Sequence, residues 1–172
     1  MAQNSNQFNQ SVEKGMLTLD PNWSTLNCLV STNEAGTLVA GQAVTVEDAA
    51  GSQIPVLAAT STTDKIFGFI PHNVKTDSYT ALDQVKIARA GDIIYLEAAA
   101  AIARDARLEA VVSGNKVQTQ TTGSLIGVAL DKATADGDII RVLLVENEQA
   151  LIGAAPVVQV ATVSATLAEI NA

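Results

Sequence analysis

Short apolar runs separated by Gly, Asn and Asp fill the middle of this 172-residue chain. Between Leu26 and Glu146 the turn residues recur about every ten positions, a spacing typical of a β-sandwich or β-barrel. Apolar residues alternate with other residues in several of these runs, as expected of strands with one buried face. The expected strands cover residues 26–31, 43–47, 54–59, 66–70, 85–89, 93–97, 107–112, 117–121, 125–130 and 138–145. The pattern therefore predicts one all-β domain over residues 26–146.

The segment AAAAIARDARLEAVV, residues 98–112, gives two conflicting signals. Ala, Arg, Leu and Glu are all good helix formers, so propensity alone favours a helix. The segment is short, however, and lies between two expected strands. We therefore expect one helical turn near residues 101–105, followed by a strand over residues 107–112.

The motif Gly-Asp-Ile-Ile occurs at residues 91–94 and again at residues 137–140. Each copy follows small or polar residues and precedes an expected strand. Glycine readily adopts a positive φ angle, and an Asp side chain accepts hydrogen bonds from nearby backbone. We therefore interpret both copies as turns that lead into strands, and not as metal-binding loops.

Both ends of the chain differ from the domain between them. Residues 1–25, the expected N-terminal arm, are rich in Asn and Gln near their start and contain two isolated large apolar residues, Phe8 and Trp23. Two interpretations are open: a disordered leader, or an arm that becomes ordered on a partner through these two anchors. The first ten residues lack the basic start and apolar stretch of a secretion signal, so synthesis in the cytoplasm is expected.

Residues 147–172, the expected C-terminal arm, contain two charged residues, Glu148 and Glu169. Both faces of an extended chain would be apolar here, so we expect a strand that pairs with its own domain or with a neighbouring chain, followed by a short helix over residues 164–170. Pro156 and the absence of basic flanking residues argue against a membrane span. The interface residues expected from the two arms are Phe8, Trp23, Leu151, Ile152, Val157, Val158 and Val160.

Charge and aromatic content exclude several kinds of partner. The chain has 10 Lys and Arg against 18 Asp and Glu, for a net charge of -8. This is the wrong sign for neutralising phosphates, so neither nucleic acid nor an anionic membrane is an expected partner. Aromatic residues make up 3% of the chain, too few for a ligand site based on stacking.

Candidate catalytic and metal-binding groups are few. One cysteine and one histidine exclude a disulfide framework and a Cys/His zinc site. Cys28 lies in an apolar run and is expected to be a buried, inert thiol, whereas His72 is expected in a surface loop. Asp131, Asp136 and Asp138 do not have the spacing of a calcium loop, so we interpret them as a solvated turn. With no catalytic or phosphate-binding motif, we expect neither an enzyme nor a bound cofactor.

Several segments, taken in order, resemble one known family. They are AGTLVAGQAVTV, IFGFI, VKIARAGDIIYLEA, ARLEAVVSGNKVQ and GSLIGVALDKATADGDIIRVLLV. Their glycines and Gly-Asp turns follow the order and spacing of the phage structural cement (capsid decoration) family, although residues 104–106 read Arg-Asp-Ala where the family has a Gly-Asp turn. The resemblance implies a small β-barrel or β-sandwich (β-tulip-like) with extended arms and no active site. It also implies a protein that binds the outside of the mature icosahedral head and bridges major capsid subunits against internal DNA pressure.

Two other classes of protein are compatible with the same features. A tail or fibre component of the virion would share the β architecture and the acidic surface. A small-molecule-binding barrel is disfavoured because few aromatic and convergent polar groups are available to line its pocket. For a cement protein we expect a homo-oligomer, with a closed trimer favoured over a dimer, because a closed ring leaves no interface unpaired.

Overall fold

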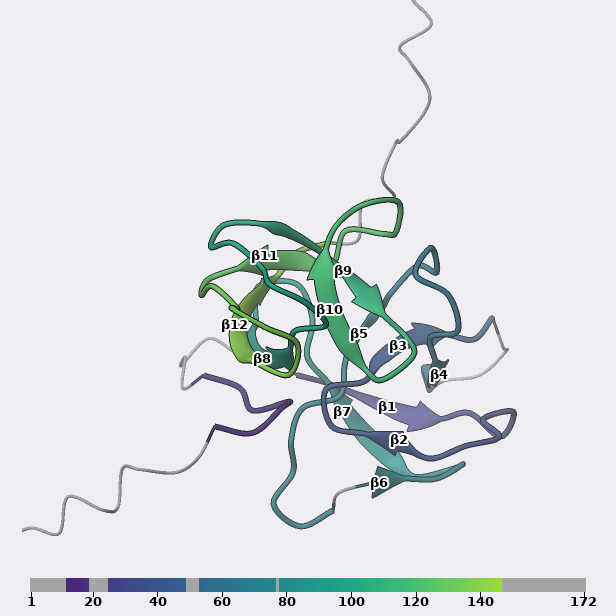
Figure 1. Cartoon of the computed structure of the whole chain (residues 1–172). Helices are drawn as coiled ribbons and strands as arrows, with labels where there is room; N and C mark the ends of the chain where they lie inside the picture. Colours follow the sequence, from purple (N-terminus) through teal and green to yellow (C-terminus); the bar gives the residue numbers. More distant parts are fainter. Residues whose placement is uncertain (1–11, 19–24, 49–52, 77, 147–172) are drawn as a thin grey trace, which may run out of the picture.

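The computed structural model describes residues 12–18, 25–48, 53–76 and 78–146, which form twelve strands and no helix (Figure 1). The strands are β1 (Leu26–Val30), β2 (Leu38–Val39), β3 (Ala43–Val46), β4 (Pro55–Ala58), β5 (Gly68–Phe69), β6 (Ser78–Tyr79), β7 (Gln84–Ile87), β8 (Ile93–Glu97), β9 (Arg107–Val111), β10 (Lys116–Thr119), β11 (Gly127–Ala129) and β12 (Ile139–Leu144). Every strand expected from the sequence overlaps one of these, so the all-β prediction is confirmed. The short strands β2 and β6 were not expected.

The first half of the chain forms a five-stranded sheet in the order β5-β3-β4-β1-β7, which we call the N-terminal sheet. All its neighbours are antiparallel except β1 and β4, which are parallel. Its two outer strands meet where Phe69 and Ala88 exchange backbone hydrogen bonds of 3.0 and 2.8 Å. The sheet therefore curls until its edges touch, while β2 and β6 pair separately as a small ribbon.

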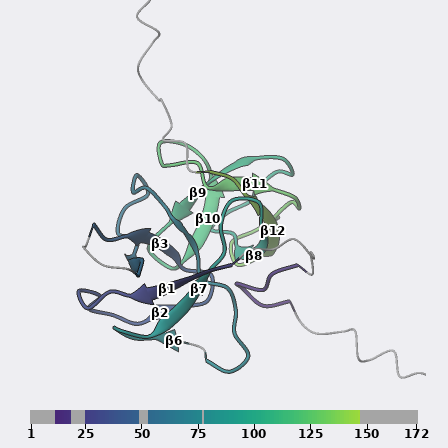
Figure 2. The same cartoon turned by 180° about the vertical axis from the view of Figure 1, so that it is seen from behind.

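The second half forms the C-terminal sheet, in the order β10-β9-β11-β12-β8. It also curls until its edges meet, because Ala98 pairs with Val117 and the Ala99 N–H donates to the Val117 carbonyl at 2.8 Å. Figures 1 and 2 show the two sheets from opposite sides, with β1, β2, β6 and β7 in one part of the molecule and β8, β11 and β12 in the other. Joining the outer strands leaves few unpaired backbone groups at the sheet edges.

Two apolar clusters fill these sheets, and they are not equivalent. The N-terminal core contains residues of the N-terminal sheet and the ribbon only, among them Val30, Leu38 and Ile87. The second cluster fills the C-terminal sheet but also takes in Ile66 and Phe69 from the N-terminal half. We call this second cluster the shared core, because it fastens the two sheets to each other.

The expectation of a helical turn over residues 101–105 is wrong. Ile102 instead pairs with Ala133 through reciprocal backbone hydrogen bonds of 3.0 and 2.9 Å, and Asp105 occupies a turn with φ of 63°. The alanines that favoured a helix serve packing, since Ala98 and Ala110 are buried in the shared core. Tertiary packing has overridden local propensity here.

Both Gly-Asp-Ile-Ile motifs are turns, as the sequence predicted. Gly91 and Gly137 have φ angles of 99° and 91°, in the region that glycine tolerates best. Asp92 accepts a hydrogen bond from the Arg89 backbone N–H at 2.9 Å, and Asp138 accepts one from the Thr134 backbone N–H at 2.7 Å. In each case the Asp side chain closes the turn that precedes a strand.

Residues 12–18 lie along β8 and are fastened to it. The Gly15 N–H donates to the Tyr95 carbonyl at 2.6 Å, and the Tyr95 N–H donates to the Met16 carbonyl at 2.8 Å. Lys14 adds an ion pair to Glu97 at 3.2 Å. This short segment therefore covers the edge of β8, while the division of the chain into arms and domain at residues 25 and 146 stays a prediction.

Candidate interaction surfaces

The chemically reactive residues lie where they serve structure. Cys28 is buried in β1, as predicted, and burial raises the pKa of its thiol. His72 lies in a loop, also as predicted, with its Nε2 atom 3.5 Å from a carboxylate oxygen of Glu13. Among the residues described, no three His, Cys, Asp or Glu side chains are grouped so that they could hold a metal ion. The described part of the chain also contains no helix able to cross a membrane.

The three clustered aspartates each have a separate role in the turn. Asp131 binds the Arg141 guanidinium through two contacts of 2.8 Å, and these hydrogen bonds lower the pKa of the Asp131 carboxyl to about 2. Asp136 pairs with Lys116 at 2.7 Å. Asp138 closes the Thr134 turn, and hydrogen bonds from that turn lower the pKa of its carboxyl. The interpretation of this cluster as a turn and not as a calcium loop is consistent with these contacts.

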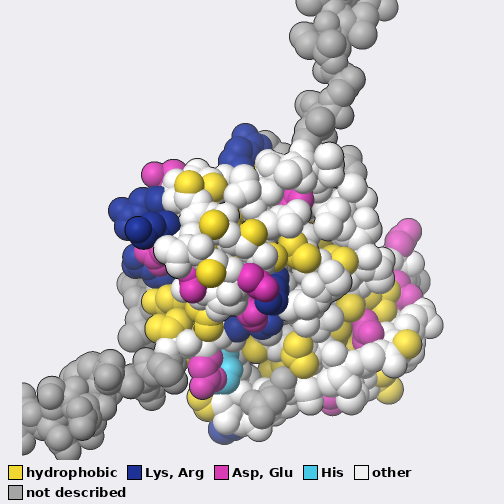
Figure 3. All heavy atoms as spheres, viewed as in Figure 1, with side chains coloured by type: hydrophobic (Ala, Val, Ile, Leu, Met, Phe, Trp, Pro, Cys, Tyr) yellow, Lys and Arg dark blue, Asp and Glu magenta, His cyan; other side chains and the backbone are white. Residues whose placement is uncertain are grey.

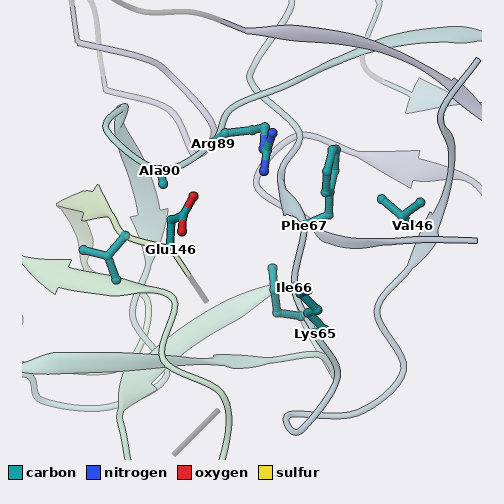
Figure 4. A pocket seen from close by; sticks show the side chains of 8 residues that line it. Val46, Lys65, Ile66, Phe67, Arg89, Ala90 and Glu146 are labelled. Carbon is teal, nitrogen blue, oxygen red and sulfur yellow. The ribbon is translucent and has the colours of Figure 1, made fainter. Parts of the chain in front are cut away.

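A hollow of about 460 Å³ opens along the line where the two sheets meet, and we call it the seam groove (Figure 4). The N-terminal half supplies Val46, Lys65 and Phe67, and the chain between the sheets supplies Arg89. Glu146, the residue that follows Val145 beyond β12, completes the wall. The groove therefore combines an apolar side with two cations and one carboxylate.

The geometry of the seam groove depends on close packing beneath it. The Arg89 guanidinium lies 4.3 Å from the centre of the Phe67 ring, a cation–π distance that holds both side chains along the groove. Gly68 follows directly, and a Cβ atom there would collide with the backbone of Ala88. Glycine at position 68 thus permits the close approach of the two outer strands of the N-terminal sheet.

A second hollow, of about 510 Å³, lies beside the segment that covers β8. Leu17, Pro71, Tyr79 and Val85 form its apolar lining. Val74 stands at its border and is 88% exposed, the largest exposure among the big apolar side chains described. This hollow is more apolar than the seam groove and has no comparable group of cations.

Basic side chains gather at the end of the C-terminal sheet, on the side of the molecule where β11 and β12 lie (Figure 3). Arg104 and Lys132 are both exposed, on two segments that the pairing of Ile102 with Ala133 brings together. Asp131, which is bound to Arg141, lies close enough to Arg104 for their charges to interact, and it offsets part of the positive charge. The surface therefore differs locally from the acidic chain as a whole.

The seven interface residues predicted from the arms lie outside the residues that the structure describes. They are Phe8, Trp23, Leu151, Ile152, Val157, Val158 and Val160. The predicted helix over residues 164–170 also lies outside the described residues. These expectations stay predictions.

Sequence reasoning missed the seam groove and one buried carboxylate. Glu109, within β9, is 1% exposed and accepts backbone hydrogen bonds from Thr121, Thr122 and Gly123 at 2.8, 3.1 and 2.6 Å. Gln118 also donates to it at 2.6 Å. The sequence did offer a signal for this buried carboxylate, namely one Glu among apolar residues in the expected strand over residues 107–112. A carboxylate on a buried face requires nearby hydrogen-bond donors.

Comparisons with known proteins give one family match and one similar solved structure. A family model described as structural cement protein (E217 gp24/Pam3 gp6) matches residues 2–145. No curated protein sequence matches the chain. A solved structure, the N base of the head fibre gp8.5 of bacteriophage phi29, is similar with 13% sequence identity and a TM-score of 0.47, over 73% of this chain and 97% of that chain.

Proposed function

This chain belongs to the phage structural cement protein family, and on that premise we propose that it attaches to the outer surface of the mature icosahedral head. There it bridges neighbouring major capsid subunits and stabilises the shell against the pressure of packaged DNA. The observation that carries the proposal is the family match, which spans residues 2–145 and therefore nearly all of the folded part. Membership gives the protein a structural role in the virion, and the attachment site and bridging are our proposal.

Stabilisation requires only that the protein bind the expanded lattice better than the unexpanded one. A ligand that binds one state stabilises that state by mass action, by an amount that grows with its free concentration. Contacts to two capsid subunits by one molecule add avidity, because the second contact forms at a high effective concentration. No catalytic step is needed for this activity.

The folded body suits a protein that has to resist mechanical stress. Both sheets have their outer strands joined, at Phe69 with Ala88 and at Ala98 with Val117. The shared core connects the sheets through buried side chains, among them Phe69 and Leu96. A body closed in this way has few free edges to pair with the wrong partner, which supports its role as a discrete clamp.

Support for an N-terminal arm comes from residues 12–18, which are bound to β8. The ion pair of Lys14 with Glu97 and the hydrogen bond from Gly15 to Tyr95 hold the start of any longer arm on the body. Eleven preceding residues, fully extended, reach about 36–40 Å. We propose that Phe8 anchors this arm on a neighbouring capsid subunit.

The remaining anchors extend the same proposal. Trp23 is the only Trp of the chain and stands in a polar stretch, a setting in which such a side chain commonly inserts into a partner pocket. Val157, Val158 and Val160 belong to a β-branched stretch suited to pairing with a neighbouring chain. We also propose a homo-oligomer, a trimer before a dimer, because attachment at a local symmetry axis favours a closed ring.

Binding to heads in three states tests this function. The full chain is mixed with DNA-filled heads, empty expanded heads and unexpanded heads, and bound protein is measured by pelleting. We expect binding to both kinds of expanded head and little to the unexpanded one, together with density at regular sites over the shell in cryo-microscopy. Density confined to a tail or fibre would support the other virion component and overturn the cement proposal.

Single anchors are tested in the same assay. Phe8→Ala is expected to weaken binding to expanded heads by roughly tenfold or more, since truncating an interface anchor removes most of its buried contact. Gln7→Ala, its direct neighbour, is the matched control and is expected to bind like the unmodified chain. Equal binding by both variants would remove Phe8 from the interface.

A further inference from the structure

We propose that the first part of the C-terminal arm, residues 147–152, occupies the seam groove of its own chain. In this arrangement Leu151 and Ile152 cover the apolar side of the groove at Val46 and Phe67. The proposal concerns the free protein and does not depend on attachment to a head. It assigns an occupant to a hollow that combines two cations with apolar side chains.

The position where the described chain ends is the first argument. The Leu144 N–H donates to the Asp92 carbonyl at 2.9 Å and the Val145 N–H donates to the Ile126 carbonyl at 3.1 Å, so the backbone is fixed up to the groove. Val145 and Glu146 themselves form part of its wall. Residue 147 therefore begins at the groove, and six extended residues can span about 20 Å. A segment tethered at its own binding site has a high effective concentration there.

The apolar match is the second argument. Val46 is 43% exposed at the end of β3, whereas Val44, two residues earlier on the same face of the strand, is fully buried. Phe67 is half-buried and offers its ring to the groove beneath Arg89. Leu151 and Ile152 are the first two large apolar residues beyond Glu146. They would cover apolar surface that otherwise faces water.

Charge complementarity is the third argument. Neither Lys65 nor Arg89 forms an ion pair with any carboxylate in the described part of the chain, although both line the groove. Figure 4 shows Arg89 beside Phe67, with the Glu146 carboxylate on the other side of the hollow. Glu148 lies two residues beyond Glu146, and residues 147–172 contain no basic side chain to oppose the two cations. The segment thus carries the charge that the groove lacks.

Disulfide trapping tests the occupant and its origin. In a Cys28→Ala background, Val46→Cys is combined with Ile152→Cys, and oxidation is followed on non-reducing gels at low and high protein concentration. We expect an intrachain disulfide that forms at a rate independent of concentration. The control pair joins Val74→Cys, at the other hollow, to the same Ile152→Cys and is expected to oxidise at least tenfold more slowly. Equal rates for the two pairs, or disulfides that link two chains only, would overturn the proposal.

Hydrogen exchange gives an independent measurement on the otherwise unmodified full chain. We expect amides of residues 149–152 to be protected, with protection lost in Val46→Asp and kept in the control Val74→Asp. Protection must also survive hundredfold dilution, because the contact lies within one chain. Absence of protection overturns the proposal, and protection that disappears on dilution assigns the groove to a second copy instead. Head binding is measured separately, so failure here and failure of the cement function are distinguishable.

Discussion

The N-terminal and C-terminal sheets share one design but hold their loops by different means. Each has five strands and outer strands joined by one bridge. In the N-terminal sheet the stabilising carboxylates lie at the surface: half-buried Glu34 accepts backbone hydrogen bonds from Gly36 and Ala58 at 2.9 and 2.8 Å. In the C-terminal sheet Glu109 does so from the interior. The same kind of interaction should therefore contribute much more in the second sheet, because a buried donor left without its acceptor has no water to replace it.

The two apolar cores show a second difference between the halves of the molecule. The N-terminal core draws only on its own sheet and ribbon, whereas the shared core includes Ile66 and Phe69 from the other half. Loss of the shared core would expose surface on both sheets. The C-terminal half is thus the part on which the cohesion of the whole body depends.

The largest expected effect is on the shared core. Leu108 is 0% exposed, and Leu108→Ala should lower the free energy of unfolding by about 2–5 kcal/mol through lost burial and the cavity that remains. Because the core spans both sheets, we expect one cooperative transition in urea, followed by circular dichroism in the far and near ultraviolet. Val74→Ala, at an exposed position, should stay within about 0.5 kcal/mol of the unmodified protein. Two separate transitions would show that the sheets unfold independently.

The second largest effect is expected at Glu109, and the same substitution at Glu34 provides the comparison. In Glu109 one carboxylate oxygen accepts all three backbone bonds from the loop over residues 121–123, and the other accepts from the Gln118 amide and the Thr121 hydroxyl. Glu109→Gln keeps the size of the side chain but removes its charge and one of these two acceptor oxygens. We expect a loss of about 2–3 kcal/mol, because buried N–H groups lose a charged acceptor. Glu34→Gln should cost about 0.5–1 kcal/mol, since water can reach its partners. Urea denaturation measures both, and equal losses would contradict the difference between the sheets.

Lowering the pH should test the contribution of Glu109 to stability separately. Burial alone would raise the pKa of Glu109, but hydrogen bonds from Gln118, Thr121 and Gly123 outweigh burial and leave its pKa below the ordinary value of 4.5. A folded pKa below the unfolded one means that stability is fully present above about pH 4.5 and is lost as the pH falls through the folded value. We expect the Tm to decrease on going from pH 6 to pH 3. In Glu109→Gln this decrease should be smaller, and an unchanged slope would exclude Glu109 as a main cause.

The turns of this fold could be predicted from the sequence better than the contacts that join the outer strands of each sheet. Turns at Asp92 and Asp138 follow from local chemistry, because Gly and Asp stabilise them without distant contacts. The meeting of Phe69 with Ala88 depends on residues far apart in the chain, and no local pattern encodes it. The helical turn expected at residues 101–105 failed for the same reason, since burial in the shared core decides what those alanines do.

The candidate surfaces also divide into some that the sequence predicts and one that depends on contacts between distant segments. The two arms are predicted from composition, since apolar residues such as Phe8 stand out in a polar stretch, and they stay predictions. The seam groove was not, because Val46, Phe67 and Arg89 come from separate segments and each has an ordinary local environment in the sequence. The pairing of β3 with β5 and the meeting of Phe69 with Ala88 bring these three residues together.

The smallest expected effect concerns the exposed ion pair of the C-terminal sheet. Arg141 contacts Asp131 at 2.8 Å, with 43% and 31% of the two side chains exposed, so solvent screens much of the attraction. Asp131→Asn should lower the Tm by on the order of 1 °C at low salt. At 1 M salt, where the Debye length is about 3 Å, the difference between variant and unmodified protein should shrink further. The Glu109→Gln difference should persist at high salt, because buried hydrogen bonds are screened much less than exposed charges. If salt removed both differences alike, the contrast between interior and surface carboxylates would not hold.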